Sequence, residues 1–281
     1  MSITEARARA TSKPPGIPGL KHIFAVASGK GGVGKSTTAC NLALGLAALG
    51  LRIGILDADV YGPSQPKLFG LRGKPRLIGD RMLEPMERFG VKIMSIGFLV
   101  EEDLAMIWRG PMVISAITQM LREVAWGDLD VLVVDLPPGT GDAQLTMAQQ
   151  TPLAGAVIVS TPQDIALIDA KRGIAMFQRV DVPLLGVIEN MSGFCCPNCK
   201  HITPIFGYGG ARKEAERIGV PFLGEVPLDL HICETSDNGR PIVAVEPDST
   251  HAKLFISMAH QIWLALSTQR VGKPAPRIVI E

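Results

Sequence analysis

The chain has 281 residues, of which 47% are hydrophobic and 20% charged, and its formal net charge is +1. This balance is typical of a globular protein with a substantial core, and it excludes intrinsic disorder. A charge so close to zero gives no overall field for nucleic acid or an anionic membrane, so neither is an expected partner. No stretch approaches the apolar length that crosses a bilayer, and the N-terminus lacks a secretory signal, so we expect a cytoplasmic protein.

The first 20 residues are predicted to form a flexible arm ahead of the folded part. Three basic residues outnumber the single acid, Glu5, and three prolines then interrupt any helix. The alternative is the remnant of an organelle-targeting peptide, for which the segment is short and its amphipathic pattern weak. We expect one domain over residues 21–268, followed by a tail at 269–281.

Short runs rich in valine, isoleucine and leucine alternate with helical stretches, which predicts a doubly wound, mainly parallel α/β sheet flanked by helices. The expected strands are 23–27, 52–56, 91–96, 131–134, 156–160, 184–188 and 222–225. The expected helices are 35–49, 113–124, 142–149, 165–179, 211–218 and 250–266. Residues 70–85 are irregular and predict a surface hairpin.

A glycine-rich loop follows the first expected strand. Residues 28–37 read Ser-Gly-Lys-Gly-Gly-Val-Gly-Lys-Ser-Thr, which matches G-x-x-x-x-G-K-[ST], the signature of the P-loop NTPase fold. The glycines let backbone N–H groups close around phosphate oxygens, and the dipole of the following helix adds positive potential. Lys35 is expected to reach the β and γ phosphates of ATP, Ser36 to ligate Mg²⁺ and Thr37 to touch the α phosphate. The alternative, a turn that merely joins strand to helix, is disfavoured by the complete pattern in this setting.

Three carboxylates follow neighbouring strands. Asp57 and Asp59 come after the strand at 52–56, where carboxylates can orient water or bind Mg²⁺ through water. Asp135 ends the apolar strand at 131–134, the Walker B arrangement for holding Mg²⁺. The alternative for the first two is a helix-capping or turn aspartate, which carries more weight for Asp57 than for Asp59. Glycines after Asp135 would let that loop respond to the γ phosphate.

A C-x-x-C turn, Cys196 to Cys199, can place two thiolates on one metal or cluster edge, and Cys195 adds a third sulfur nearby. Two of the four usual ligands are then missing, and a second subunit can supply them on the axis of a homodimer. Cys40, in the helix after the P-loop, and the isolated Cys233 do not complete a four-cysteine site. The alternatives are a redox-active dithiol, a zinc knuckle shared between chains and plain buried thiols, and zinc accepts the same ligands.

The loop with its second lysine, Lys30, resembles the deviant Walker A loop of the ATPases that include septum-positioning, plasmid-partition, arsenite-pump and nitrogenase iron proteins. The resemblance implies that Lys30 crosses a dimer interface to the partner's nucleotide, as an arginine finger does in trans. It also implies that Asp59 positions the attacking water, that 135–142 is the second switch, and that the Asn190 amide binds the adenine edge. The implied nucleotide-binding set is Gly29, Lys30, Gly31, Gly32, Val33, Gly34, Lys35, Ser36, Thr37 and Asn190.

Several segments together resemble the Mrp/ApbC subfamily of iron-sulfur cluster carrier ATPases, over about residues 19–266. These segments are 57–64, 108–111, 135–142, 160–164, 190–199 and 205–207. The resemblance implies a homodimer that hydrolyses ATP slowly with Mg²⁺ and carries a labile [4Fe-4S] cluster. Its implied partners are scaffold proteins and apo iron-sulfur clients. Relatives in mitochondria serve respiratory complex I assembly, so the mitochondrial matrix is the alternative location.

The resemblance implies two groups of site residues, and this sequence departs from the family pattern in two features. The implied catalytic residues are Lys30, Lys35 and Asp59, and the implied metal ligands are Ser36, Asp59, Asp135, Cys196 and Cys199. Many bacterial members carry a small additional domain where this sequence has the arm, which leaves open how clients are contacted. The Cys195–Cys196 doublet also exceeds the family pattern.

A second hypothesis shares the P-loop: a positioning or partition ATPase whose dimer docks on membrane or nucleoid. A membrane-docking member is expected to end in a basic amphipathic helix. The helix expected at 250–266 carries only Lys253 among strong bases and predicts packing against the core. The C-x-x-C turn together with the P-loop favours the cluster carrier.

Overall fold

The structure, a computed structural model, describes residues 14–100 and 110–268. Most of the predicted arm, the predicted tail, and the Trp108 and Arg109 positions of the family resemblance lie outside the described residues. Ile17 is already buried in the core, ahead of the predicted domain start at residue 21. No helix in the described part of the chain has the length and apolar character needed to cross a membrane.

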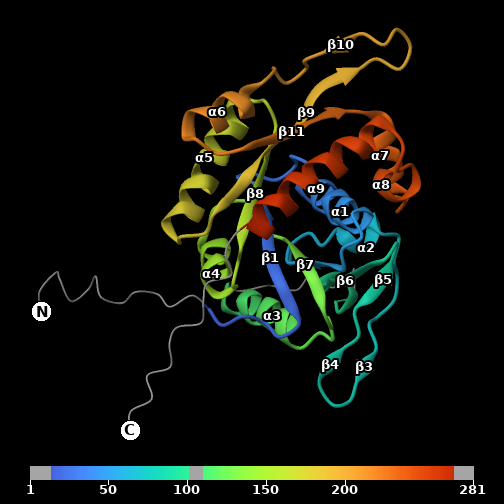
Figure 1. Cartoon of the computed structure of the whole chain (residues 1–281), viewed down its shortest axis with the longest axis vertical. Coiled ribbons are helices and arrows are strands. Elements are labelled where there is room, and N and C mark those ends of the chain that lie inside the picture. The colour runs from blue at the N-terminus through green and yellow to red at the C-terminus, as the bar shows by residue number, and fades with distance from the viewer. Residues whose placement is uncertain (1–13, 101–109, 269–281) are drawn as a thin grey trace, which may run out of the picture.

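The described residues form a nine-stranded, mainly parallel sheet, which confirms the predicted fold class (Figure 1). Its order is β10-β9-β8-β1-β7-β2-β6-β5, with β11 also paired to β9, and only the β5–β6 and β10–β9 pairs are antiparallel. Its strands are β1 (Leu20–Ala27), β2 (Ile53–Asp57), β5 (Met86–Arg88), β6 (Val91–Ser95), β7 (Leu129–Asp135), β8 (Gly155–Ser160), β9 (Leu184–Cys195), β10 (Ile202–Thr203) and β11 (Phe222–Leu228). The surface hairpin predicted within 70–85 is confirmed as β3 (Leu77–Ile78) and β4 (Met82–Leu83).

Helices cover both faces of the sheet, as a doubly wound fold requires (Figure 1). On one face, each helix of a group of five contacts the next one along the chain. These helices are α1 (Lys35–Ala48), α2 (Gln65–Leu68), α7 (Leu230–Asp237), α8 (Ile242–Val245) and α9 (Thr250–Thr268). The other group contains α3 (Gly110–Arg122), α4 (Asp142–Gln150), α5 (Asp164–Arg179) and α6 (Gly210–Ile218). A short 3₁₀ turn, η2 (Ile96–Phe98), follows β6.

The helix that opens at the P-loop, α1, lies between the sheet and α9, and this explains why ten of its 14 residues are buried. A Cβ at Gly45 would come within 2.9 Å of the Ala259 Cβ and 3.2 Å of the Phe255 carbonyl oxygen. Glycine at this position therefore lets α9 pack directly on α1. The core-packing interpretation of the C-terminal helix is confirmed, because six of its residues, including Phe255 and Ile262, are buried.

The central parallel strands end at one edge of the sheet, and their register brings the motifs together. Asp57 of β2 pairs in register with Asp135 of β7, and Ser160 of β8 pairs with Glu189 of β9. The predicted end of β9 at residue 188 is wrong, because the strand continues to Cys195. The polar run after residue 188 is buried and hydrogen-bonded instead of forming a loop. Glu189, for example, accepts from the backbone N–H groups of Gly209 (3.0 Å) and Ala211 (2.7 Å).

Candidate nucleotide site and cysteine hairpin

The P-loop forms a cradle, and at three of its glycines a side chain would be strained or would collide with a neighbour. Gly32 and Gly34 have φ of 79° and 77°, in the left-handed region that favours glycine. A Cβ at Gly34 would collide with the Asn190 amide, and a Cβ at Gly29 would collide with the backbone of Asp169. Helix α1 starts after Gly34 without a side-chain cap, so its first N–H groups can bind an anion. This cradle fits a polyphosphate.

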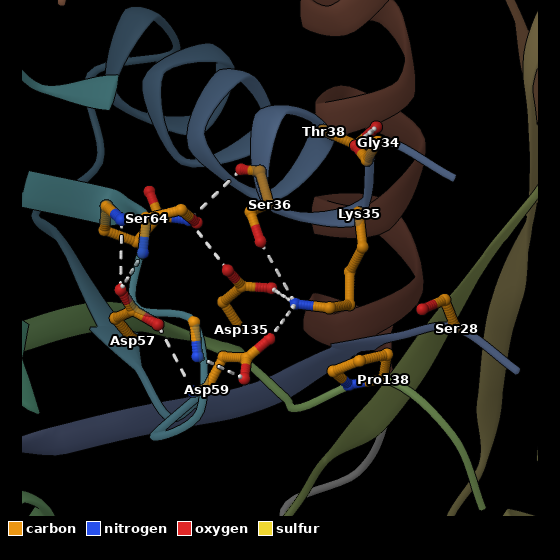
Figure 2. Close-up of polar contacts among 12 residues, drawn as sticks. Ser28, Gly34, Lys35, Ser36, Thr38, Asp57, Asp59, Ser64, Asp135 and Pro138 are labelled. Carbon is orange, nitrogen blue, oxygen red and sulfur yellow. Dashed lines mark hydrogen bonds and ion pairs between the residues drawn. The ribbon is translucent and has the colours of Figure 1, made fainter. Parts of the chain in front are cut away.

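Lys35 lies at the centre of the site with its side chain only 6% exposed (Figure 2). Its Nζ forms an ion pair with Asp135 Oδ1, donates to Ser36 Oγ at 3.1 Å and lies 3.9 Å from Asp59 Oδ2. The structure therefore brings the predicted lysine, hydroxyl and two carboxylates into one cluster. Hydroxyl and carboxylate oxygens are the donors that Mg²⁺ prefers, so this set fits a magnesium ion with a bound nucleotide.

Asp57 fixes the segment that carries Asp59. Its Oδ2 accepts from the backbone N–H groups of Ser64 (2.9 Å) and Gln65 (3.0 Å) and from Ser95 Oγ (3.0 Å). Its Oδ1 accepts from the Asp59 N–H at 3.2 Å. Burial and the nearby Asp135 charge raise the pKa of Asp57 to about 7. Asp57 is thus part of the polar network that the sequence predicted, but its oxygens bind the protein itself.

Asp59 is more accessible than Asp57. Its Oδ1 accepts from the Gly62 N–H at 3.3 Å, while Oδ2 faces Lys35. Burial raises the pKa of Asp59, and the Lys35 charge opposes that shift. A carboxylate with one oxygen directed into the cluster and the other on a backbone N–H can bind or orient a water there.

Two further predicted residues contact parts of the same chain. Lys30 Nζ donates to Oε1 of Gln163, the residue just ahead of α5, at 3.1 Å. Asn190 Nδ2 donates to the Val33 carbonyl oxygen at 2.8 Å, so its amide supports the P-loop backbone. The trans contact of Lys30 and the adenine contact of Asn190 stay predictions.

Cys195, Cys196 and Cys199 lie on the hairpin formed by β9 and β10, which projects from the sheet (Figure 1). The Lys200 N–H donates to the Cys196 carbonyl oxygen, and the Cys196 N–H donates to the His201 carbonyl oxygen, each at 2.9 Å. These bonds close a tight turn, in which Lys200 has a φ of 60°. The backbone N–H groups of Cys199 and then Asn198 stabilise the thiolate of Cys196 and lower its pKa.

The other cysteines do not join this pair in one chain. Cys195 Sγ contacts the Lys200 carbonyl oxygen at 3.8 Å, and Cys233 is exposed on α7. Cys40 is buried in α1, where burial raises the pKa of its thiol. Within residues 14–100 and 110–268, no three His, Cys, Asp or Glu side chains are grouped so that they could hold a metal ion. One chain therefore offers a pair of thiols, as the sequence predicted.

Comparison with known proteins decides the family. The family model described as ParA, NUBPL iron-transfer P-loop NTPase, matches residues 19–263. The chain belongs to this family. Among its NUBPL-type relatives, the mouse iron-sulfur cluster transfer protein NUBPL is 54% identical, over 92% of this chain and 82% of its own. The iron-sulfur cluster carrier protein of Escherichia coli K12 is 53% identical, over 88% of this chain and 68% of its own.

One solved structure that is similar to this NUBPL-type chain contains a bound nucleotide. The nucleotide-binding protein of Archaeoglobus fulgidus in complex with ADP is 43% identical, with a TM-score of 0.71, over 83% of this chain and 91% of that chain. The predicted family resemblance and P-loop NTPase fold are confirmed. The carrier hypothesis is supported over the positioning ATPase, because several relatives above 50% identity are named as iron-sulfur cluster carrier or transfer proteins.

Three residues that contact the site had no signal in the sequence. Ser95, Gln65 and Gln163 bind Asp57, Asp135 and Lys30 respectively. Ser95 and Gln65 lie outside the segments of the family resemblance, and Gln163 lies within 160–164 without a role assigned to it, so only the fold shows what the three side chains contact. Of the three, only Ser95 could have been suspected from the sequence, because it is a polar residue at the end of a predicted strand that lies parallel to β2.

Proposed function

We propose that this protein is an ATPase that carries a [4Fe-4S] cluster as cargo between two copies of the chain and transfers it to apoproteins. One observation carries the proposal: strand β9 connects the nucleotide site to the cysteine turn. Asn190, in this strand, donates to the P-loop, and the same strand ends at Cys195, at the start of the cysteine turn. The family and the names of the relatives support cluster transport.

The ATP half of the proposal uses the cluster around Lys35. We assign the phosphates to the P-loop N–H groups and to Lys35, and Mg²⁺ to Ser36 with Asp135. When bound, Mg²⁺ neutralises charge on the β and γ phosphates. Asp59 orients the attacking water, since its Oδ2 faces this cluster. Lys35 must exchange its carboxylate partners for phosphate oxygens, so nucleotide binding redistributes charge among Asp59 and Asp135.

The cluster half needs two chains, because each contributes Cys196 and Cys199 alone. Their turn projects from the sheet, and Cys199 is exposed, so the pair is accessible to a second copy. Four thiolates from two such turns match the usual ligand count of a [4Fe-4S] cluster. An exposed site that is shared between subunits also suits cargo that must be released.

The two halves are coupled, in this proposal, through a bulge in β9. Met191, directly after Asn190, has a φ of 58°, which a non-glycine side chain rarely adopts. The pairing of β9 with β11 shifts register between Val226 and Leu228, opposite this residue. A change at the P-loop that moves Asn190 would therefore also move Met191, where the strand is irregular. The regular pairing of β9 resumes at Phe194, directly before the cysteines.

Anaerobic reconstitution with iron and sulfide, followed by Mössbauer spectroscopy, tests this proposed function. A [4Fe-4S] spectrum with about two iron atoms per chain is expected, because two chains share one cluster. The same preparation is offered zinc as a competitor, since zinc accepts the same thiolates. Stoichiometric zinc with no cluster under any loading condition would reject cluster carriage.

Replacing Lys30 with alanine separates hydrolysis from nucleotide binding. If Lys30 acts on the partner's nucleotide, phosphate release should fall roughly 10³-fold, as for loss of an arginine finger, while ADP affinity changes by less than about threefold. Cluster content should stay near that of the wild type. The measurement is phosphate release alongside titration of a fluorescent ADP analogue.

Gln163→Ala is the matched control for Lys30→Ala. It removes the partner that holds Lys30 in its own chain without removing the lysine. Hydrolysis by this variant should be at least as fast as in the wild type. Full activity of Lys30→Ala would show that the lysine takes no part in the reaction.

A further inference from the structure

We infer that Gln65 is a positioning residue for the magnesium ion: its amide N–H holds Asp135, and its amide oxygen accepts a hydrogen bond from a metal-bound water. The inference rests on the proposed ATP site. Gln65 is the first residue of α2, immediately after the segment that Asp57 fixes, and it is fully buried (0% exposed). A polar side chain at that depth is expected to have both ends of its amide in use.

The donor end of the amide joins two parts of the site. Gln65 Nε2 donates to Asp135 Oδ2 at 2.9 Å and to the Ser36 carbonyl oxygen at 3.1 Å. Both partners are acceptors, so the NH₂ group must face them and the amide orientation is fixed. Gln65 therefore ties the Walker B carboxylate to the first turn of the P-loop helix.

The acceptor end of the amide has no hydrogen-bond partner among the residues that the structure describes. Gln65 Oε1 is buried without a hydrogen bond, and so is the neighbouring Ser64 Oγ. These oxygens belong to consecutive residues at the start of α2, whose backbone N–H groups bind Asp57, and an unpaired buried oxygen is a group that a bound water can satisfy. Magnesium usually keeps several of its waters, and these are strong donors that bind neighbouring oxygens.

The two oxygens of Asp135 have separate partners, and this gives Gln65 its role. Oδ1 pairs with Lys35, while Oδ2 accepts from Gln65. When Lys35 moves to the phosphates, the bond from Gln65 is the one that keeps the carboxylate oriented. The backbone N–H of Gln65 also binds Asp57 at 3.0 Å, so the same residue connects the Asp59 segment to the metal carboxylate.

The test is the magnesium dependence of ADP binding. A fluorescent ADP analogue is titrated with excess Mg²⁺ and with EDTA, using the wild type, Gln65→Leu and, as a control, Gln261→Leu. The control removes the amide of Gln261, a residue of α9 that donates to the Leu223 carbonyl oxygen of β11 and has no contact with Asp135 or Ser36 among the described hydrogen bonds. Gln65→Leu should lose about tenfold of the affinity gained from Mg²⁺, as for loss of other groups that orient metal ligands. Affinity in EDTA should stay within about twofold of the wild type, and Gln261→Leu should match the wild type in both conditions.

Each other outcome overturns the inference in a recognisable way. An unchanged gain from Mg²⁺ in Gln65→Leu shows that Gln65 does not act on the metal, even when the variant is less stable. An equal loss of affinity in EDTA and Mg²⁺ shows a role in folding alone. If Gln65→Leu does not fold, Gln65→Met, with similar length and no donor, is titrated in its place. Absence of ADP binding by the wild type would reject the ATP site itself.

Discussion

Lys35→Ala is expected to abolish ATP hydrolysis and to destabilise the protein in the absence of nucleotide. The lysine side chain is 6% exposed and pairs with the fully buried Asp135, with Asp59 at 3.9 Å. Removing one partner of a buried ion pair typically costs about 3–5 kcal/mol, because the other charge stays buried without compensation. The free energy of unfolding, from urea denaturation followed by circular dichroism, should fall by about that amount.

A double variant separates this electrostatic effect from the chemistry. Asp135→Asn, added to Lys35→Ala, removes the uncompensated charge and should recover a large part of the lost stability. Hydrolysis should stay absent, because the phosphate ligand and the magnesium carboxylate are both missing. Cluster binding should persist in both variants, since the thiols lie on a different hairpin. Unchanged stability in Lys35→Ala would contradict the central ion pair.

Cys196→Ser and Cys199→Ser are each expected to lose more than about 90% of the reconstituted iron. A serine hydroxyl does not ionise near neutral pH and is a poor ligand for iron in a sulfur cluster, so one change leaves two of the four ligands missing in the dimer. Iron and sulfide per chain, measured after anaerobic reconstitution, give the result. ADP binding should remain, which shows that the variants are folded.

Cys195→Ser is the matched control, because it changes a sulfur on the same hairpin. Its Sγ contacts the Lys200 carbonyl oxygen, outside the pair formed by Cys196 and Cys199. Iron content should stay within about twofold of the wild type. Loss of the cluster in this variant alone would make Cys195 a ligand and would overturn the assignment of the C-x-x-C pair.

The sequence predicted much of the fold because its signals are local. Apolar runs marked the strands, and the glycine pattern at 29–34 placed the P-loop between β1 and α1, where the structure has it. The end of β9 was missed because Glu189 and Asn190 are polar, whereas a parallel strand buried on both faces is expected to be a continuous apolar run. Their burial depends on contacts with Gly209 and Val33, which are remote in sequence.

The site itself was predicted unevenly. Lys35 and Ser36 come together with the carboxylates of Asp59 and Asp135, as expected, because parallel strands end at one edge of the sheet. The partner of Lys30 was not foreseen, since Gln163 is 133 residues away along the chain. Gln65 likewise had no pattern to mark it, because its importance comes from two acceptors on other elements.

Native mass spectrometry of the anaerobically loaded protein tests the central claim most directly, because it weighs chains and cluster together. The account predicts a species with two chains and one [4Fe-4S] unit, which is lost when Cys196 or Cys199 is replaced by serine. A cluster held by a single chain, or a loaded dimer that persists in both serine variants, would contradict it.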